Sequence, residues 1–232
     1  MNYLIKSILK QESIEILNSK IIKTSILSSA FGSICEKIEL ENGKKLVIKA
    51  QKIKNDSQYR SIYCEGKSIQ DMNKKFPDFF PKIHHLKNNF FVMDWIEHNN
   101  IINEFSEKDL AKKLSQIHSI KNNEFGYSYN TPIGGLEQPS KFNKSWINFF
   151  RENRLLMIIK KINKSNPLPT EINIGLDKII NNLEKFIPES NNASLVHGDL
   201  WSGNILYNDG KLAGFIDPSI NFANNELDLS SL

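Results

Sequence analysis

The chain has 232 residues, of which 40% are hydrophobic and 24% charged, an ordinary composition for one or two globular domains with a buried core. Lysine and arginine exceed aspartate and glutamate by only four (30 against 26), and the lysines are scattered, so we expect no nucleic-acid-binding surface. The apolar runs are short, so we expect neither a secretory signal nor a membrane span. Two cysteines without CxxC spacing, Cys35 and Cys64, argue against structural zinc and fit a reducing cytoplasm.

The first third of the chain predicts strands and one helix. Residues 21–27 and 34–40 are rich in β-branched side chains, and Asn42-Gly43 is a two-residue hairpin signal before residues 45–50. Residues 59–74 are predicted to be helical, and residues 90–96 to form a buried strand.

The rest of the chain is mainly helical in pattern. Ser106 followed by Asp109 indicates a helix start, and further helices are predicted over residues 145–162 and 174–186. Short strands then return at 195–196, 205–207 and 211–216, the last two joined by Asp209-Gly210. We therefore predict an α+β chain with a two-lobed protein-kinase-like fold: a β-rich nucleotide-binding lobe over 1–94, a hinge near residue 94, and a mainly helical catalytic lobe over 95–232.

The richest cluster of chemistry-bearing residues is His197-Gly198-Asp199-Leu200-Trp201-Ser202-Gly203-Asn204, followed by Ile216-Asp217-Pro218. Phosphoryl transfer to a hydroxyl needs a carboxylate near the attacking oxygen and oxygen ligands that hold Mg²⁺ on the phosphates. Asp199, an Asn five residues later and an Asp after the next hairpin supply that set, with the spacing of a protein-kinase catalytic loop. A polar surface turn is the alternative interpretation, which the downstream Ile-Asp-Pro disfavours.

Two neighbours of this cluster are interpreted differently. We expect His197 to be a buried structural residue bonded to the loop backbone rather than an acid or base. Trp201 fits either core packing or one wall of a substrate pocket.

A matching set of nucleotide-binding residues is predicted in the first third. Lys49 ends an apolar strand, and Glu65, sixteen residues later, lies where a helical carboxylate can pair with it. The turn at 28–33, with Gly32 and Ser33, is placed to fold over the phosphates. The alternative for both charged residues is ordinary solvent exposure. The adenine-contacting hinge is predicted at Met93, Asp94 and Trp95.

With these residues in place, the chain resembles the fructosamine kinase (ketosamine-3-kinase) family, relatives of aminoglycoside and choline kinases. The resemblance covers essentially the whole chain. Its most specific segment is residues 197–204 with 216–218, and residues 125–127, 133–134, 138 and 146–155 are similar to a middle signature of the family.

The resemblance implies ATP- and Mg²⁺-dependent phosphorylation of the 3-hydroxyl of a ketosamine, either a free glycated amine or a glycated protein lysine, as a step of protein repair. It implies that Asp199 is the catalytic base and that Asn204 and Asp217 are metal ligands. Lys49 with Glu65 is then the phosphate clamp, and residues 93–95 contact adenine.

Two departures from the family pattern stand out. Ser33 occupies the place of a family cysteine, with Cys35 two residues later, which argues against thiol-based control of that loop. Family members continue for several further helices, so the resemblance implies a C-terminal lobe that is incomplete at Leu232.

Two other functions stay open at this point. The same fold phosphorylates aminoglycosides, choline or other small alcohols, and a non-catalytic remnant that binds nucleotide is the third hypothesis. The sequence leaves the preferred sugar and the oligomeric state open.

Overall fold

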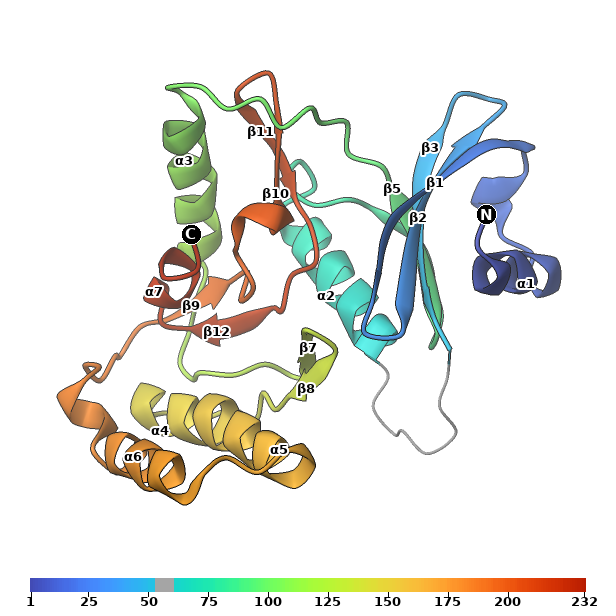
Figure 1. Ribbon diagram of the computed structural model, residues 1–232. Helices are drawn as coiled ribbons and strands as arrows, with labels where there is room; N and C mark the ends of the chain where they lie inside the picture. The colour runs from blue at the N-terminus through green and yellow to red at the C-terminus, as the bar shows by residue number, and fades with distance from the viewer. Residues whose placement is uncertain (53–60) are drawn as a thin grey trace. The chain divides into compact units, whose positions relative to one another are not determined.

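The computed structural model describes residues 1–52 and 61–232, and these form two compact units. The first unit contains residues 1–113, 134–136 and 201–218, and the second contains residues 114–133, 137–200 and 219–232. Helices and strands occur in both units, which agrees with the predicted α+β class (Figure 1). The lobe boundary at residue 94 stays a prediction. No helix among the described residues is long and apolar enough to span a membrane.

An antiparallel five-stranded sheet organises the first unit, with strand order β1-β2-β3-β5-β4. The strands are β1 (Ile21–Ala30), β2 (Ser33–Leu40), β3 (Lys45–Gln51), β4 (Ile83–Leu86) and β5 (Phe90–Asp94). Burial alternates along β2, where Ile34, Ile38 and Leu40 lie in the core. This alternation is what a strand with one buried face requires, so the predicted strands are confirmed with shifts of a few residues at their ends.

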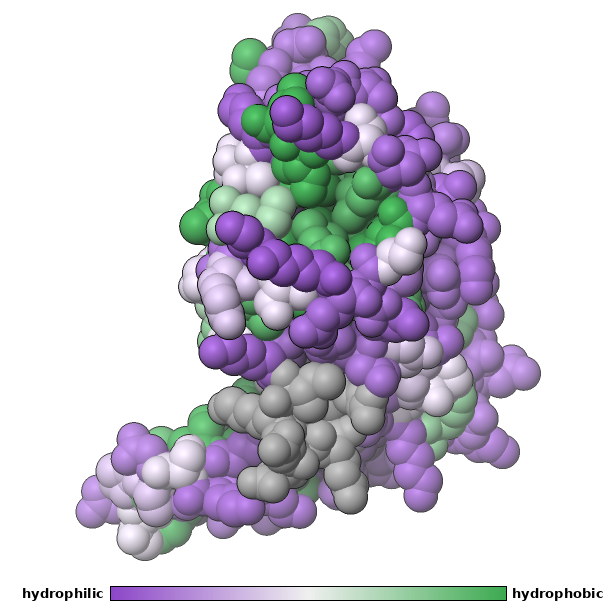
Figure 2. Space-filling model, turned by 90° about the vertical axis from the view of Figure 1, so that its right-hand side faces the viewer, coloured by the Kyte–Doolittle hydropathy of each residue, from purple (hydrophilic) through white to green (hydrophobic). Residues whose placement is uncertain are grey.

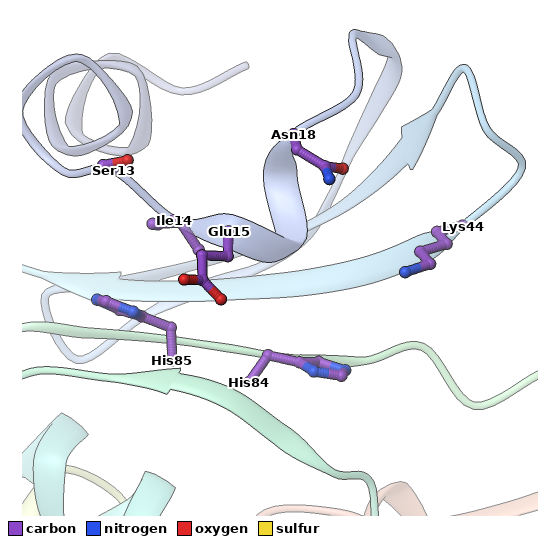
Figure 3. Close-up of a pocket in the computed structure, with 7 residues that line it drawn as sticks. All are labelled: Ser13, Ile14, Glu15, Asn18, Lys44, His84 and His85. Atoms are coloured by element: carbon purple, nitrogen blue, oxygen red, sulfur yellow. The ribbon is translucent and has the colours of Figure 1, made fainter.

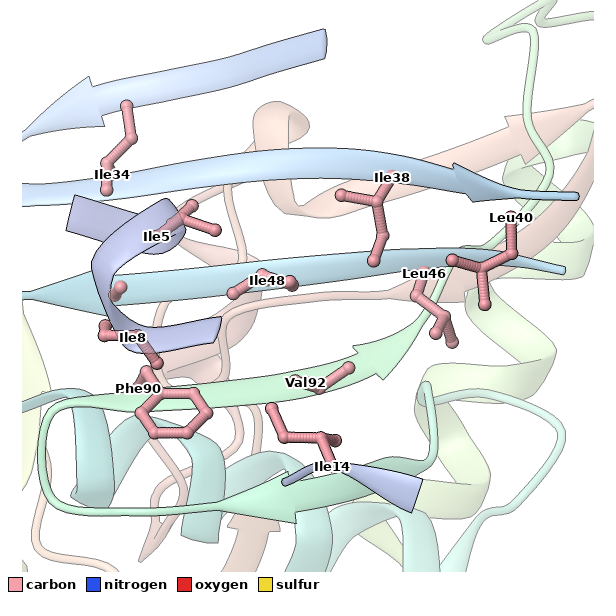
Figure 4. Close-up of a cluster of buried hydrophobic side chains, with 11 residues drawn as sticks. Ile5, Ile8, Ile14, Ile34, Ile38, Leu40, Leu46, Ile48, Phe90 and Val92 are labelled. Atoms are coloured by element: carbon pink, nitrogen blue, oxygen red, sulfur yellow. The ribbon is translucent and has the colours of Figure 1, made fainter. Parts of the chain in front are cut away.

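A helix that the sequence analysis did not predict, α1 (Tyr3–Gln11), packs against this sheet. Ile5 and Ile8 of α1 point into one apolar cluster with strand residues such as Ile48 and Phe90 (Figure 4). The apolar positions 4, 5, 8 and 9 have helical spacing, and that was the missed signal. Figure 2 shows the side of the molecule that carries α1, where hydrophilic side chains border a hollowed hydrophobic area.

The helix α2 (Ser61–Lys75) contacts β3, β4 and β5. Its Ile62 and Ile69 pack with Val47 and Phe91 of the sheet. Gly66 permits the close approach, because a Cβ at this position would lie 2.9 Å from the Phe91 ring. The first residues of the predicted helix, 59 and 60, lie outside the described residues.

Two hairpin turns test the turn predictions. Between β10 (Ile205–Asn208) and β11 (Lys211–Phe215), Asp209 and Gly210 form a two-residue turn with φ of +50° and +79°, as type I′ geometry requires. The two-residue turn predicted at Asn42-Gly43 is wrong in length. The Leu40 N–H donates to Lys44 O, so residues 41–43 form a longer loop that ends in Gly43 at φ +83°.

The second unit combines helices with a short sheet in the order β12-β9-β6. Its strands are β6 (Lys121–Asn122), β9 (Ala193–Val196) and β12 (Asn221–Ala223), and a small hairpin, β7 (Thr131–Ile133) and β8 (Leu136–Gln138), precedes the helices. The helix α3 (Ser106–His118) begins in the first unit and ends in the second.

The helix predicted over residues 145–162 is present as three consecutive segments. They are α4 (Trp146–Phe150), a π-helical stretch (Arg151–Leu156) and α5 (Met157–Ser165). The helix α6 (Thr170–Asn181) and a 3₁₀ turn (Leu183–Lys185) occupy the next predicted helix, and α7 (Glu226–Leu229) ends the unit. Trp146 and Phe149 are buried in a cluster with Phe125, Val196 and Ala223.

Candidate active site

Lys49 and two carboxylates form a buried charge cluster in the first unit. The Lys49 Nζ lies 2.5 Å from Glu65 Oε1 and 3.1 Å from Asp217 Oδ2. Only 12% of the Lys49 side chain and 13% of the Glu65 side chain are exposed. The ion pair expected between Lys49 and Glu65 is therefore present, and Asp217 joins it from a distant part of the chain.

The electrostatics of the cluster keep Lys49 charged. Burial opposes the charged ammonium, but the attraction of Glu65 and Asp217 outweighs it and raises the pKa of Lys49 above the ordinary lysine value. Burial also raises the pKa of Glu65 to about 8, with the Lys49 ammonium opposing the rise and the Asp217 carboxylate adding to it. Two carboxylates share one ammonium, so the three groups titrate as a coupled set. A buried lysine held in this way is a fixed positive charge suited to a polyphosphate.

The predicted metal ligands, Asn204 and Asp217, lie in one short stretch of the first unit. The Ile216 N–H donates to Asn204 O at 3.1 Å, which ties the residue before Asp217 to Asn204. Asn204 is 5% exposed, and Asp217 has a φ of +53°, in the left-handed region that Asp adopts more readily than most residues. The main chain at Asn204 thus lies next to the residue that precedes Asp217.

This donor set fits magnesium better than a metal held by protein alone. Within residues 1–52 and 61–232, no group of three or more His, Cys, Asp or Glu side chains is arranged to hold a metal ion. Mg²⁺ usually takes one or two carboxylates, keeps several waters and completes its shell with substrate phosphates. The side chains of Asn204 and Asp217 carry oxygen atoms of that kind, and Asp217 also contacts Lys49. Their role as metal ligands stays a prediction.

The turn between β1 and β2 is tighter than a phosphate-binding loop of several residues. Ala30 pairs with Ser33, so only Phe31 and Gly32 form the turn, with φ of +51° and +75°. Ser33 Oγ donates to Ala30 O at 2.8 Å, and Gln51 Nε2 donates to Phe31 O at 3.2 Å. The predicted contribution of Gly32 and Ser33 to phosphate binding stays a prediction.

The predicted hinge, residues 93–95, overlaps the end of β5. Met93 is buried, but the N–H groups of Asp94 and Trp95 already donate to Lys82 O and Lys45 O. The next N–H, that of Ile96, makes no hydrogen bond with any described residue. It is therefore a main-chain donor without a partner among the described residues, and the sequence did not single it out. Contact of Met93, Asp94 and Trp95 with adenine stays a prediction.

Asp199 lies in the second unit, in the loop after β9. Its N–H donates to His197 Nδ1 at 3.3 Å, and His197 is fully buried, as expected for a structural histidine bonded to the loop backbone. Asp228 of α7 anchors the same loop. Its carboxylate accepts the N–H groups of His197 and Gly198 at 2.9 and 2.8 Å.

Gly198 stands where protein kinases have an arginine, and the structure gives a reason. Its φ is +81°, and an added Cβ would lie 2.1 Å from Ser219 O. A side chain at this position is therefore excluded by both backbone conformation and space.

The sequence left two interpretations open for Trp201, and it gave no sign that Asp228 is buried. Trp201 is 54% exposed and its ring lies against Gly203, so it does not belong to the core. Asp228 is not singled out by any pattern in the sequence. Because a carboxylate beside apolar positions of a helix is ordinary in sequence, only the fold reveals that it is buried and fully engaged.

Comparison with known proteins finds a matching family model and several similar proteins. A family model described as fructosamine kinase matches residues 6–232. A probable ketoamine kinase of Enterococcus faecium is 28% identical over 145 residues, covering 61% of this chain and 50% of that protein. A chloroplastic protein-ribulosamine 3-kinase of Arabidopsis thaliana is 27% identical, covering 60% of this chain and 43% of that protein.

Solved structures with a similar fold include kinases of the same kind of architecture. A structure described as a fructosamine-3-kinase of Thermobifida fusca has a TM-score of 0.80 at 20% identity, covering 92% of this chain and 74% of that one. An aminoglycoside phosphotransferase in complex with AMP-PNP and hygromycin B has a TM-score of 0.64 at 12% identity, covering 91% and 71%. These likenesses confirm the predicted kinase-like fold. The chain spans about half the length of the curated relatives cited above.

Proposed function

We propose that this chain, which belongs to the fructosamine kinase family, transfers the γ-phosphoryl group of ATP to the 3-hydroxyl of a ketosamine. The acceptor is a fructose or ribulose adduct of an amine, either free or on a protein lysine, and the setting is cytoplasmic repair of glycated amines. The names of its relatives, ketoamine kinase and protein-ribulosamine 3-kinase, support this acceptor class.

The observation that carries the proposal is the buried Lys49–Glu65–Asp217 cluster. In it, the Lys49 ammonium, whose pKa is raised, lies against the side chains of Glu65 and Asp217 before any ligand binds. Such preorganised charge stabilises a phosphoryl group in transfer without reorganisation of the protein. The Lys49 ammonium binds the ATP phosphates, and Glu65 keeps it oriented.

The remaining roles follow from the chemistry of each side chain. The Asp199 carboxylate orients the acceptor hydroxyl and accepts its proton as the new P–O bond forms and ADP departs. Asn204 and Asp217 would hold Mg²⁺, which neutralises phosphate charge when bound. The Ile96 N–H and the backbone of residues 93–95 contact adenine, and Gly32 with Ser33 lies over the phosphates.

The test is ATP consumption with Mg²⁺ and lysine modified by ribulose or fructose. We expect turnover in the parent protein, and loss of turnover with retained nucleotide binding in Asp199→Ala and in the isosteric Asp199→Asn. Turnover that persists in both variants would remove Asp199 as the base. A correctly folded parent protein without turnover on either adduct would favour the non-catalytic alternative.

The alternative acceptors are separated in the same assay. Cationic antibiotics and choline would need exposed carboxylates to bind. Asp228, one of the two acidic residues of α7, is 0% exposed and accepts hydrogen bonds from the His197 and Gly198 backbone. We therefore expect glycated amines to be phosphorylated in preference to aminoglycosides or choline. Faster turnover of choline or an aminoglycoside would overturn the assigned acceptor.

A further inference from the structure

A cavity of about 570 Å³ lies in the first unit, apart from the residues assigned to phosphoryl transfer. Its lining comes from three segments: the chain after α1, the loop between β2 and β3, and the strand β4 (Figure 3). The lining residues are Ser13, Ile14, Glu15, Asn18, Lys44, His84 and His85. The volume is in the range of small-molecule sites.

A β-bulge places two consecutive histidines at this cavity. Neighbouring side chains on a regular strand point to opposite faces. The pairing of β4 with β5 shifts between Ile83 and His85, so that His84 is an extra residue in the ladder. Both His84 and His85 line the cavity as a result, and bulges of this kind commonly redirect side chains toward binding sites.

His85 has an unsatisfied polar atom. Its ring stacks on Phe90, with 5.2 Å between the ring centroids, and its Nε2 is buried without a hydrogen-bond partner among the described residues. A buried polar nitrogen without a partner is unfavourable by about 1–3 kcal/mol. This nitrogen is enclosed by protein atoms, so we assign it no contact with an occupant of the cavity.

Two opposite charges face the cavity from different segments. Figure 3 shows the Lys44 ammonium and the Glu15 carboxylate directed toward the space above the two histidines, Lys44 from the β2–β3 loop and Glu15 from the chain after α1. Neither side chain makes an ion pair with any described residue. A ligand that carries one charge of each sign complements both.

We propose that this cavity binds a small zwitterion of the α-amino acid class. Its carboxylate lies at Lys44 and its ammonium lies at Glu15. Asn18 and Ser13 supply further hydrogen-bonding groups at the rim of the cavity.

A direct contact links the cavity to the adenine segment. His84 Nε2 lies 2.6 Å from Asp94 Oδ1, and Asp94 is one of the residues that we assign to adenine contact. An occupant that contacts and shifts His84 therefore shifts Asp94 as well, and this changes the affinity for ATP. This coupling rests on the proposed function, whereas binding of the zwitterion does not.

Titration calorimetry of the full chain without nucleotide tests the binding. The probes are glycine, L-serine and L-lysine, with acetate and methylamine as single-charge controls. We expect at least one amino acid to bind at millimolar concentration and both controls to bind more weakly. Lys44→Gln and Glu15→Gln should each weaken that binding by about tenfold, a difference of ~1.4 kcal/mol. The matched variants Lys20→Gln and Glu41→Gln, which change exposed charges outside the lining, should leave it unchanged.

The outcomes separate this site from the kinase proposal. Absence of binding by all three amino acids, or equal binding by the parent and both lining variants, would overturn the site whatever the kinase assay shows. Binding that depends on Lys44 and Glu15 supports the site even in a protein without turnover. A change in ATP affinity on adding the amino acid, lost in His84→Gln, supports the coupling, and an unchanged ATP affinity overturns it.

Discussion

The carboxylate of Asp228 accepts the backbone N–H of Gly198 at 2.8 Å, from a position thirty residues farther along the chain. The same carboxylate accepts the N–H of His197 and lies 2.9 Å from His118 Nε2. Asp228 is fully buried, so these bonds replace the water that its charge has lost. The backbone immediately before the proposed base is therefore fixed by a residue near the end of the chain.

The first prediction concerns this anchor. Asp228→Asn keeps the shape of the side chain but turns one acceptor oxygen into a donor that faces a backbone N–H. Because hydrogen bonds to a charged acceptor are worth about 1.5–3 kcal/mol, we expect the free energy of unfolding to fall by about 2 kcal/mol. Urea denaturation measures that loss. We also expect kcat to fall by more than the affinity for ATP, because Asp228 positions the loop of Asp199 and does not touch nucleotide.

The matched control is Glu226→Gln, two residues earlier on the exposed side of α7. It should leave both the unfolding free energy and kcat close to the parent values. Equal effects of the two substitutions on the unfolding free energy and kcat would contradict the prediction. They would mean that the loss of a negative charge from α7, and not the loss of the hydrogen bonds to His197 and Gly198, causes the change.

The second prediction separates backbone strain from lack of space at Gly198. Gly198→Ala combines an unfavourable φ of +81° with a Cβ only 2.1 Å from Ser219 O. Gly43→Ala meets a similar φ of +83° with nothing within 4 Å of the added Cβ. Strain alone costs about 1–2 kcal/mol, so Gly43→Ala should destabilise the protein by that amount and Gly198→Ala by clearly more.

Thermal unfolding of the two alanine variants, side by side, gives the comparison. Similar melting temperatures would mean that the backbone of Ser219 moves away at little cost. The lack of space at Gly198 would then not be a reason for a glycine at this position.

The third prediction concerns the orientation of Lys49. Glu65→Gln retains a hydrogen-bond acceptor but removes one of the two carboxylates around the ammonium. Since a charge-assisted bond is lost, we expect the dissociation constant for ATP to rise by about tenfold, or ~1.4 kcal/mol. Fluorescence titration with a nucleotide analogue measures it. Glu39→Gln, which removes a surface partner of Lys23 and Lys37, is the control and should bind ATP like the parent.

An unchanged nucleotide affinity in Glu65→Gln would contradict the role of the pair. In that case Asp217 alone would suffice to hold Lys49.

The fourth prediction concerns thiol chemistry near the same cluster. Burial raises the pKa of Cys35 to about 12, with Lys49 opposing that rise and Asp217 and Glu65 adding to it. The thiolate is the reactive form, so it is scarce in the folded protein below pH 12. Alkylation of Cys35 by iodoacetamide should be slow at pH 8 and should still accelerate between pH 9 and 11, above the ordinary range for cysteine.

Peptide mass mapping distinguishes Cys35 from Cys64 in this experiment, and urea-unfolded protein provides the reference rate. Rapid labelling of Cys35 in the folded protein at pH 8 would contradict the raised pKa and would reopen thiol-based control of the β1–β2 turn.

Local patterns predicted most of the elements and several of the site residues. The alternation in β2, the Asp209-Gly210 turn and the helix from Ser106 depend on neighbours in sequence, and each is present. The pairing of Lys49 with Glu65 was predicted from the strand lysine and helix glutamate of the kinase pattern, not from local propensity, and it is present. α1 was missed because its apolar spacing was considered only as a membrane or signal segment.

The sequence by itself determined the secondary-structure pattern, the family resemblance and the identity of the charged and polar groups available for phosphoryl transfer. Only the tertiary structure decided that Asp217 joins Lys49, that Asp228 anchors the His197–Gly198 backbone and that His84 and His85 line one cavity. The physical reason is distance along the chain. Local propensity acts over a few residues, whereas these contacts join segments far apart in sequence, or depend on a bulge that only strand pairing creates.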